Sequence, residues 1–365
     1  MVKIYLSTLL CAAVIVAIAL AADGPRPGPE KKPDLPQQLG LPINVLTAVY
    51  FLKIDELEEN ENHFKGTVDV RLRWRDPRNE ISQIAAISGY QDFFGEDASK
   101  KMETVWTPLV EISNLVGEPT YTTQVLRVFA DGGVEIRRRV TGTFSSEFDP
   151  ARFPFDRQKL CIKLVVRGED SKRVALDFRQ EELDFSRVAP GVEVSGWSLG
   201  LVDIRRESEP GLFGERHSAL SVELEANRVF DTSLAPIFIP LFASLLIPLM
   251  AIYLNKVEDG DFQIDAFELC NIVIGGLFAV IALNFTVNST YLSLGGTDNP
   301  VTQLFSLNYL ALGIALTIII CLFHFNLLKR MFGKYVQEQF YFFLIWAGPL
   351  LLFATSLAIL MAAAA

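Results

Sequence analysis

The stretch that decides the fold is residues 217–254, HSALSVELEANRVFDTSLAPIFIPLFASLLIPLMAIYL, where the hydrophobic pattern changes at Arg228. Residues 217–227 alternate apolar and polar side chains, which is typical of a half-buried β-strand. Residues 233–254 form a continuous apolar run that is long enough to cross about 30 Å of hydrocarbon as an α-helix. The stretch therefore predicts a boundary between a β-rich domain and a membrane-embedded helical domain.

Upstream of Arg228 the chain consists of short alternating runs separated by turn residues. In the clearest run, residues 64–75, apolar side chains such as Val70 and Trp74 alternate with charged ones such as Arg71. The other runs are residues 43–53, 124–129, 134–144, 158–166, 173–178, 197–205 and 217–227. Strands at this spacing, with no long helical period between them, predict a sandwich of two antiparallel sheets over residues 41–229.

Downstream of Arg228 four apolar runs are each long enough to span a membrane: residues 233–254, 266–288, 301–328 and 339–362. We therefore expect a four-helix transmembrane domain over residues 230–365. The connection after the third run carries Lys329, Arg330 and Lys334, whereas residues 291–300 contain no lysine or arginine. The positive-inside rule then predicts a multi-pass protein of the cell (inner) membrane, with the β-domain and the C-terminus extracellular or periplasmic.

The N-terminal end predicts export of the β-domain. Lys3, a short apolar run and Ala19-Leu20-Ala21 indicate a signal peptide over residues 1–22, since the run is shorter than about 20 residues; an uncleaved anchor is the alternative. Residues 23–40, rich in Pro, Gly and Gln, predict a flexible leader. Cys161 is the only cysteine of the exported part, which excludes an internal disulfide. The net charge of −10 argues against a nucleic-acid partner.

A series of short motifs in a fixed order resembles one known family. The central motif is Phe153-Pro154-Phe155-Asp156-Arg157-Gln158, and the others are Trp74-Arg75-Asp76-Pro77-Arg78, Trp106-Thr107-Pro108, Asn114, Asp131-Gly132-Gly133-Val134, Gly196-Trp197, Arg228 and Pro240. Together they resemble the pentameric ligand-gated ion channels, the Cys-loop receptor superfamily, in its prokaryotic form. The two cysteine positions of the signature loop fall on Ser146 and Leu160, so the resemblance implies a member without the loop disulfide.

The resemblance implies a coupling junction between the two domains. In the family the signature loop presses on the membrane domain, which would give the loop aromatics an apolar surface. Arg228 is expected to pair with Asp156 and with the acidic turn at Glu58 and Glu59; interfacial anchoring of a helix end is the alternative role. The expected junction residues are Glu59, Phe153, Pro154, Phe155, Asp156 and Arg228.

The second apolar run carries small and polar side chains on one helical face, at about 100° per residue. Such a face must meet protein or water rather than lipid, and for a lone segment a helix–helix contact is the alternative. The resemblance implies instead that second helices of five subunits line a channel. The expected pore-lining residues are Glu268, Asn271, Gly275, Phe278, Ala282, Phe285 and Ser289.

Each part of this stripe has an expected task. Glu268, preceded by further acidic residues, would form an acidic ring that selects cations at the cytoplasmic mouth. Asn271 would be a polar constriction, and the apolar stretch from Phe278 to Phe285 would gate the pore by dewetting. Asn284 points away from the stripe and is expected to bond to a neighbouring helix.

The resemblance places an agonist site between subunits in the exported domain. The expected ligand-binding residues are Arg71, Arg73, Trp106, Arg167 and Phe213. If the arginines are not simply solvated, they favour an anionic or carboxylate ligand over a quaternary ammonium. Protons are the alternative stimulus, with the acidic residues 55–61 and His63 as candidate sensors.

The whole pattern predicts a subunit of a homopentameric, cation-selective channel opened by a small-molecule agonist or by protons. Its partners would be four identical subunits, the lipid bilayer and permeant monovalent cations. A membrane-anchored sensor without conductance is the alternative. We expect no enzyme, cofactor or metal site, because the three histidines show no metal-ligand spacing and the chain has no nucleophile motif.

Overall fold

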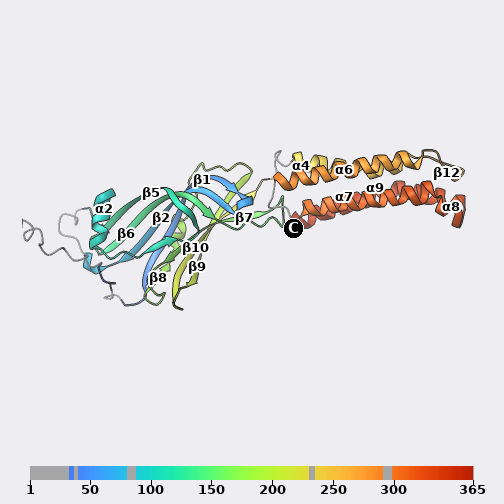
Figure 1. Ribbon diagram of the computed structural model, residues 1–365. Coiled ribbons are helices and arrows are strands. Elements are labelled where there is room, and N and C mark those ends of the chain that lie inside the picture. The colour runs from blue at the N-terminus through green and yellow to red at the C-terminus, as the bar shows by residue number, and fades with distance from the viewer. Residues whose placement is uncertain (1–32, 37–39, 80–87, 230–234, 291–297, 365) are drawn as a thin grey trace, which may run out of the picture.

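A computed structural model describes residues 33–36, 40–79, 88–229, 235–290 and 298–364 of the chain. The molecule is elongated, with a β-rich domain at one end and a bundle of helices at the other (Figure 1). The expected signal peptide, residues 1–22, and most of the expected leader, residues 23–40, lie outside the described residues.

The β-rich domain is a sandwich of a six-stranded and a four-stranded sheet. The larger sheet has the order β3-β5-β6-β2-β1-β8 and contains β1 (Ile43–Glu58), β2 (His63–Arg75), β3 (Tyr90–Phe94), β5 (Leu115–Phe129), β6 (Gly133–Ser145) and β8 (Val174–Asp177). The smaller sheet has the order β4-β7-β10-β9 and contains β4 (Val110–Ile112), β7 (Arg157–Val166), β9 (Trp197–Pro210) and β10 (Arg216–Arg228). The predicted sandwich is confirmed.

One strand pair departs from the antiparallel expectation. β8 runs parallel to β1, with Ile43 opposite Val174. The chain enters β8 from β7 of the other sheet and not by a hairpin from β1, so no tight turn requires β8 to run antiparallel to β1.

The core of the sandwich is built from the inward-facing residues of both sheets. Phe51, Phe64, Phe144 and Leu160 are among its largest fully buried side chains. Trp74 and Trp106 are also buried and meet edge to face, with ring centroids 6.0 Å apart. Asn114 links the two sheets, because its amide donates to the carbonyl oxygens of Ser145 and Cys161, each at 2.7 Å.

Four short elements are not visible in the sequence pattern. They are β3, β4, α2 (Gly95–Thr104) and α3 (Gln180–Phe185). β3 has no buried residue and therefore no alternation to read, and β4 has only three residues. Two of them bear on the candidate site: α3 supplies partners for two arginines discussed below, and β4 carries Glu111, which pairs with Arg167.

The helical half contains α4 (Ala235–Ser244), α5 (Leu246–Tyr253), α6 (Ala266–Thr290), α7 (Pro300–Ile318) with a π-helical turn (Ile319–His324), α8 (Leu327–Phe332) and α9 (Lys334–Ala364). A small hairpin of β11 (Val257–Glu258) and β12 (Asp261–Phe262) joins α5 to α6. Within the described ranges, four helical stretches are long and apolar enough to span a membrane: Ala235–Tyr253, Ala266–Ser289, Pro300–His324 and Lys334–Ala364. The first is interrupted at Leu245, between Pro240 and Pro248, since proline breaks the helical hydrogen-bond ladder.

Candidate functional site

Arg228, the last residue of β10, lies where the sandwich meets the helices. Its Nε donates to Asp156 Oδ1 at 2.6 Å, and its Nη2 donates to Glu59 Oε2 at 2.5 Å. The guanidinium also lies over the rings of Trp197 (4.2 Å) and Phe153 (4.8 Å). The structure thus brings Arg228 together with both counterions expected from the sequence, while the coupling role stays a prediction.

Burial makes this ion cluster sensitive to the loss of any member. The Arg228 side chain is 8% exposed and that of Asp156 is 1% exposed. Burial alone lowers the pKa of the Arg228 guanidinium, but the hydrogen bonds to Asp156 and Glu59 outweigh it and raise the pKa above its ordinary value. Arg228 is therefore a permanent cation held between two carboxylates from different loops.

The local fold positions Arg228 by strand pairing. β10 runs antiparallel to β7, with Asn227 opposite Arg157. The backbone N–H of Arg228 continues this ladder by donating to the Asp156 carbonyl oxygen at 3.1 Å. The end of β10 and the end of the signature loop are therefore bonded through both backbone and side chains.

The signature loop reaches into the helical half. Phe153 is 1% exposed and belongs to the apolar cluster of the helices, with Ile237, Phe238 and Leu241 of α4. Pro154 is buried as well, whereas Phe155 is 37% exposed. An aromatic side chain of the sandwich therefore forms part of the packing of the first membrane span, and a movement of the loop must disturb that packing.

Hydrogen bonds close the loop at the position where the family has a disulfide. Ser146 Oγ donates to the Lys159 carbonyl oxygen at 2.5 Å and accepts from the Cys161 N–H at 3.2 Å. Gln158 adds a second closure, because its amide bonds both backbone groups of Asp149 and also donates to Asp156 Oδ2 at 2.6 Å. Sequence reasoning identified Ser146 only as a missing cysteine and assigned no role to Gln158.

The second span, α6, has two opposite faces. Its buried face packs on the other helices of the same chain and consists of Ala266, Leu269, Val273, Gly276, Val280 and Val287. The expected pore-lining residues all lie on the exposed face: Glu268, Asn271, Gly275, Phe278, Ala282, Phe285 and Ser289. The exposed set advances by three or four residues and the buried set by three, four or, at its end, seven, which keeps each on one side of a helix.

Two adjacent glycines mark the difference between these faces. A Cβ on Gly276 would lie 2.6 Å from Ile247 Cγ2 and 3.3 Å from Leu312 Cδ2, so this glycine allows close packing against α5 and α7. A Cβ on Gly275 would meet nothing within 4 Å. Asn284 turns away from the stripe and donates to the Tyr309 hydroxyl of α7 at 3.1 Å, which confirms the expected bond to a neighbouring helix.

The acidic residues before α6 are more nearly balanced by basic residues than the sequence suggests. Lys329 bonds Asp261, and Lys334 Nζ lies 3.3 Å from Asp259 Oδ1. Glu268 is exposed, and no ion pair to it occurs in the described part of the chain. From the sequence, Lys329, Lys334 and the acidic residues before α6 are all expected on the cytoplasmic side of the membrane. That common location is the feature of the sequence that could have indicated these ion pairs.

The arginines expected in the ligand site are paired within the chain. Arg71 is buried and donates to Glu182 of α3 at 3.0 Å, with its guanidinium 4.2 Å from the Phe185 ring. Arg73 lies 3.3 Å from Glu135 and 3.0 Å from Glu181. The pairs with Glu181 and Glu182 depend on α3, which the sequence pattern does not reveal, whereas Glu135 lies on the adjacent strand β6.

The other expected ligand-binding residues differ widely in the solvent exposure of their side chains. Arg167 lies 3.2 Å from Glu111 and 3.3 Å from Glu209. Trp106 is buried in the sandwich core, and Phe213 is almost fully exposed at the tip of the β9–β10 hairpin. The three arginines thus present less uncompensated positive charge than the sequence implies, and the ligand-binding role of the set stays a prediction.

Comparison with known proteins agrees with this architecture. The sequence profile of the neurotransmitter-gated ion-channel ligand binding domain matches residues 30–229. The chain is 23% identical to the proton-gated ion channel of Gloeobacter violaceus over 251 residues, which cover 68% of this chain and 64% of the relative.

Two animal receptor subunits match over shorter regions. The chain is 25% identical to the gamma-aminobutyric acid receptor subunit pi of Rattus norvegicus over 139 residues, covering 37% of this chain and 30% of that subunit. It is 25% identical to the glycine receptor subunit beta of the same species over 141 residues, covering 36% and 27%. The chain spans less than two thirds of the length of each of these relatives.

Proposed function

Because this chain belongs to the pentameric ligand-gated ion channels of the Cys-loop superfamily, in their prokaryotic form, we propose that it is one subunit of a homopentameric, cation-selective channel. The channel would lie in the cell (inner) membrane, with residues 41–229 as the extracellular or periplasmic ligand-binding domain and residues 230–365 as the pore domain. The relatives are ion channels and not enzymes, so no catalytic step is proposed.

The observation that carries the proposal is the pair of opposite faces on α6. One face packs on the chain's own helices, and the other presents Glu268, Asn271 and Gly275 away from them. A polar stripe on a spanning helix is unfavourable against lipid, so it requires a wet or protein environment. Five copies of α6 around one axis would supply a water-filled lumen for that stripe.

The stripe also suggests where selection and gating occur. A ring of Glu268 carboxylates at the cytoplasmic mouth would attract cations and repel anions. The ring would act together with Glu258 and Asp265, since Asp259 and Asp261 are paired with lysines. Phe278, Ala282 and Phe285 would form an apolar constriction that blocks ions by dewetting until the helices separate.

Opening would be transmitted through the junction of Glu59, Asp156 and Arg228. A rearrangement of the sandwich moves the signature loop, and Phe153 carries that movement into the packing around α4. Because Arg228 bonds the same loop and stands just before the first span, the ion cluster and Phe153 would move together.

The stimulus is proposed to be a small molecule bound between subunits, with protons as the second candidate. The similarity to a proton-gated channel favours protons. The internal pairing of Arg71, Arg73 and Arg167 weakens the case for an anionic agonist, because each guanidinium already has a carboxylate partner.

The decisive experiment is current recording from the purified protein in planar bilayers, at neutral and acidic pH and in salt gradients. The expected result is a current whose reversal potential follows the cation gradient. Glu268→Gln should reduce cation preference, whereas Asp261→Asn, which neutralises an acid already paired with Lys329, should change it less. A chloride-dominated current would contradict the role of Glu268, and ligand binding without any conductance would favour the sensor.

A further inference from the structure

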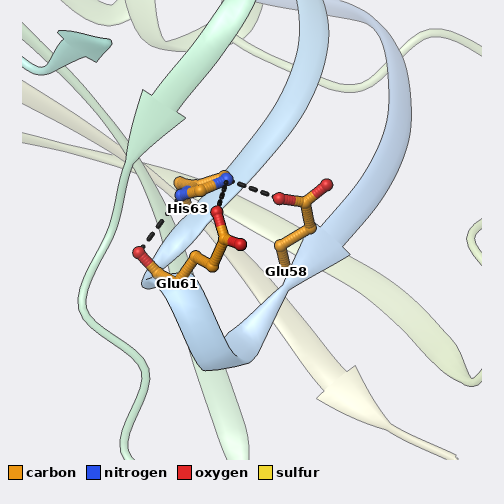
Figure 2. Close-up of side chains that lie close together, drawn as sticks. All are labelled: Glu58, Glu61 and His63. Atoms are coloured by element: carbon orange, nitrogen blue, oxygen red, sulfur yellow. Dashed lines mark hydrogen bonds and ion pairs between the residues drawn. The ribbon is translucent and has the colours of Figure 1, made fainter.

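The turn between β1 and β2 gathers one histidine and two carboxylates (Figure 2). The same turn contains Glu59, which bonds Arg228. His63 Nε2 lies 2.5 Å from Glu58 Oε2 and 3.3 Å from Glu61 Oε2. One ligand atom from each of the three side chains lies within 4.8 Å of the other two. The sequence analysis expected no metal site, because the three side chains follow no familiar spacing and converge only in the folded turn.

The backbone explains this convergence. Glu58 ends β1 opposite His63 at the start of β2, so strand pairing places these two side chains together. Between them a 3-10 helix, Glu59–Glu61, and Asn62 in the left-handed conformation (φ 55°) fold the turn back on itself. The fold thereby brings Glu61 to the same ring nitrogen, as Figure 2 shows.

The hydrogen bonding of His63 fixes which ring nitrogen faces the carboxylates. Nδ1 lies 3.1 Å from the Glu61 carbonyl oxygen, which can only accept, so Nδ1 carries a proton. In the neutral ring the lone pair of Nε2 then points at two carboxylate oxygens, an arrangement that is favourable when a metal ion or a proton lies between them. Donation of the other ring N–H to a backbone carbonyl is also the usual orientation of a metal-bound histidine.

We propose that Glu58, Glu61 and His63 form a binding site for a divalent transition metal of the Zn²⁺ type. Zinc takes one imidazole nitrogen and two carboxylate oxygens at about 2.0–2.2 Å, with water in the fourth position. Tetrahedral ligands at those bond lengths lie roughly 3.3 Å apart, a separation that Glu61 Oε2 already has from Nε2, whereas Glu58 Oε2 must retreat from Nε2 by about 1 Å. Calcium and magnesium prefer all-oxygen sites, so the imidazole favours zinc over both.

The surroundings leave room for the ion. Lys65 bonds Glu58 Oε1, the oxygen that does not face His63, so Oε2 stays available to the metal. The Glu61 side chain is 71% exposed while that of His63 is 14% exposed, which gives an open side for entry and a more protected nitrogen ligand. The site is thus preformed on a strand pair and reachable from solvent.

The location ties the ion to the domain junction. Glu59, inside the same turn, bonds Arg228. Asn62 accepts from Ser146 N–H at 2.8 Å through its carbonyl oxygen and from Phe148 N–H at 3.1 Å through its side chain. A metal that fixes Glu58, Glu61 and His63 would therefore stiffen the segment that holds both Arg228 and the signature loop.

The test is zinc binding to the purified full-length protein at pH 7.5, measured by calorimetry, with Zn²⁺ alone as the probe. This readout does not depend on conductance. We expect one zinc per chain, and at least about tenfold weaker binding in both His63→Gln and Glu61→Gln, since each removes a ligand. Glu61 lies at the surface of the turn, whereas His63 is partly buried at the start of β2, so tryptophan fluorescence checks that each variant is folded.

The matched control is His217→Gln. His217 also bonds a backbone carbonyl through Nδ1, that of Glu169, but among the described residues only the Glu215 carboxylate, at 3.5 Å, lies within ion-pair distance of its Nε2. Zinc binding should be unchanged in this variant. Absence of a stoichiometric zinc site, unchanged affinity in His63→Gln and Glu61→Gln, or displacement of zinc by equimolar calcium would each overturn the proposal.

Discussion

The sandwich and the helical half of this chain differ in how much of their apolar surface and charge is buried or paired within the chain itself. The sandwich encloses a large apolar core, and its expected ligand-site arginines have carboxylate partners in the same chain. In the helical half, only 28% of the most apolar stretch of the second span and 6% of that of the fourth are buried. The sandwich therefore owes its stability to internal packing, whereas the exposed apolar faces of the helices need the bilayer and, in the proposed pentamer, neighbouring subunits to cover them.

The junction combines features of both halves. Arg228 and Asp156 are as buried as core residues, yet they are charged and belong to the surface where the halves meet. Phe153 is a sandwich residue that packs in the core of the helices. The sandwich buries its own core, the helices leave much of their surface exposed, and the junction buries charged groups. These differences lead to four predictions.

The largest expected effect separates two phenylalanines. Phe64 is 0% exposed in the sandwich core and Phe278 is 67% exposed on α6. Phe64→Ala should lower the free energy of unfolding of the sandwich by about 3–5 kcal/mol, because it leaves a cavity. Phe278→Ala should leave that quantity unchanged and make the pore leaky. Denaturant unfolding followed by tryptophan fluorescence measures the first effect, and bilayer currents without stimulus measure the second. A Phe278 variant that stays tightly shut would mean that the gate lies elsewhere.

The next effect concerns the junction. Arg228→Gln leaves Asp156 buried without its cation, so we expect a loss of about 3 kcal/mol in unfolding free energy and loss of the stimulated current. The control is Arg206→Gln, since Arg206 also pairs with an aspartate, Asp177, and covers an aromatic ring, but is 60% exposed. That exposed pair should contribute about 0–1 kcal/mol. Equal losses in the two variants would show that burial of the junction has no special energetic role.

A smaller effect compares the two glycines of α6. Gly275→Ala and Gly276→Ala gain the same helix propensity, about 1 kcal/mol, but only the second places a methyl group against Ile247 and Leu312. The thermal stability of Gly276→Ala should therefore be lower than that of Gly275→Ala by an amount corresponding to about 1–3 kcal/mol. Thermal unfolding in detergent measures the difference. If Gly275→Ala proves the less stable of the two, the assignment of the packed and open faces is wrong.

The smallest effect lies at the cytoplasmic end. The pair of Lys329 with Asp261 is partly exposed, so Lys329→Ala should change stability by only about 0.2–1 kcal/mol. The substitution leaves the Asp261 carboxylate without its partner. The cation preference of the pore should therefore increase slightly, whereas Glu268→Gln should decrease it. Reversal potentials at low and high salt measure this, since screening weakens the effect at high salt. An unchanged cation preference would place Asp261 outside the field of the pore, and a decrease would contradict the prediction.

Several features follow from local sequence. Alternation at Val70 and Trp74 predicts a half-buried strand, and the apolar runs after Arg228 predict spanning helices, because side-chain periodicity and hydrophobic length are properties of the chain itself. The stripe from Glu268 to Ser289 also follows from helical geometry alone. The family was indicated by the ordered set of motifs along the chain, of which the motif around Phe153 and Asp156 is the central one.

Other features required the folded chain, because they join residues far apart in sequence. Arg71 looks like a surface residue in its strand, and only the packing of α3 against the sheet gives it Glu182 as a partner. Asp261 looks like an unpaired pore acid until the third–fourth connection delivers Lys329.

The sequence by itself determined a strand-rich exported half, four spanning helices, the polar stripe of α6 and the order of the family motifs. These features depend on periodicity, length and composition, which are properties of short segments of the chain. Only the tertiary structure decided which charges are neutralised, how Ser146 and Gln158 replace a disulfide by hydrogen bonds, and that Glu58, Glu61 and His63 meet at one ring nitrogen. The physical reason is that electrostatic pairing and ligand geometry depend on distance in space, which strand register and loop closure set.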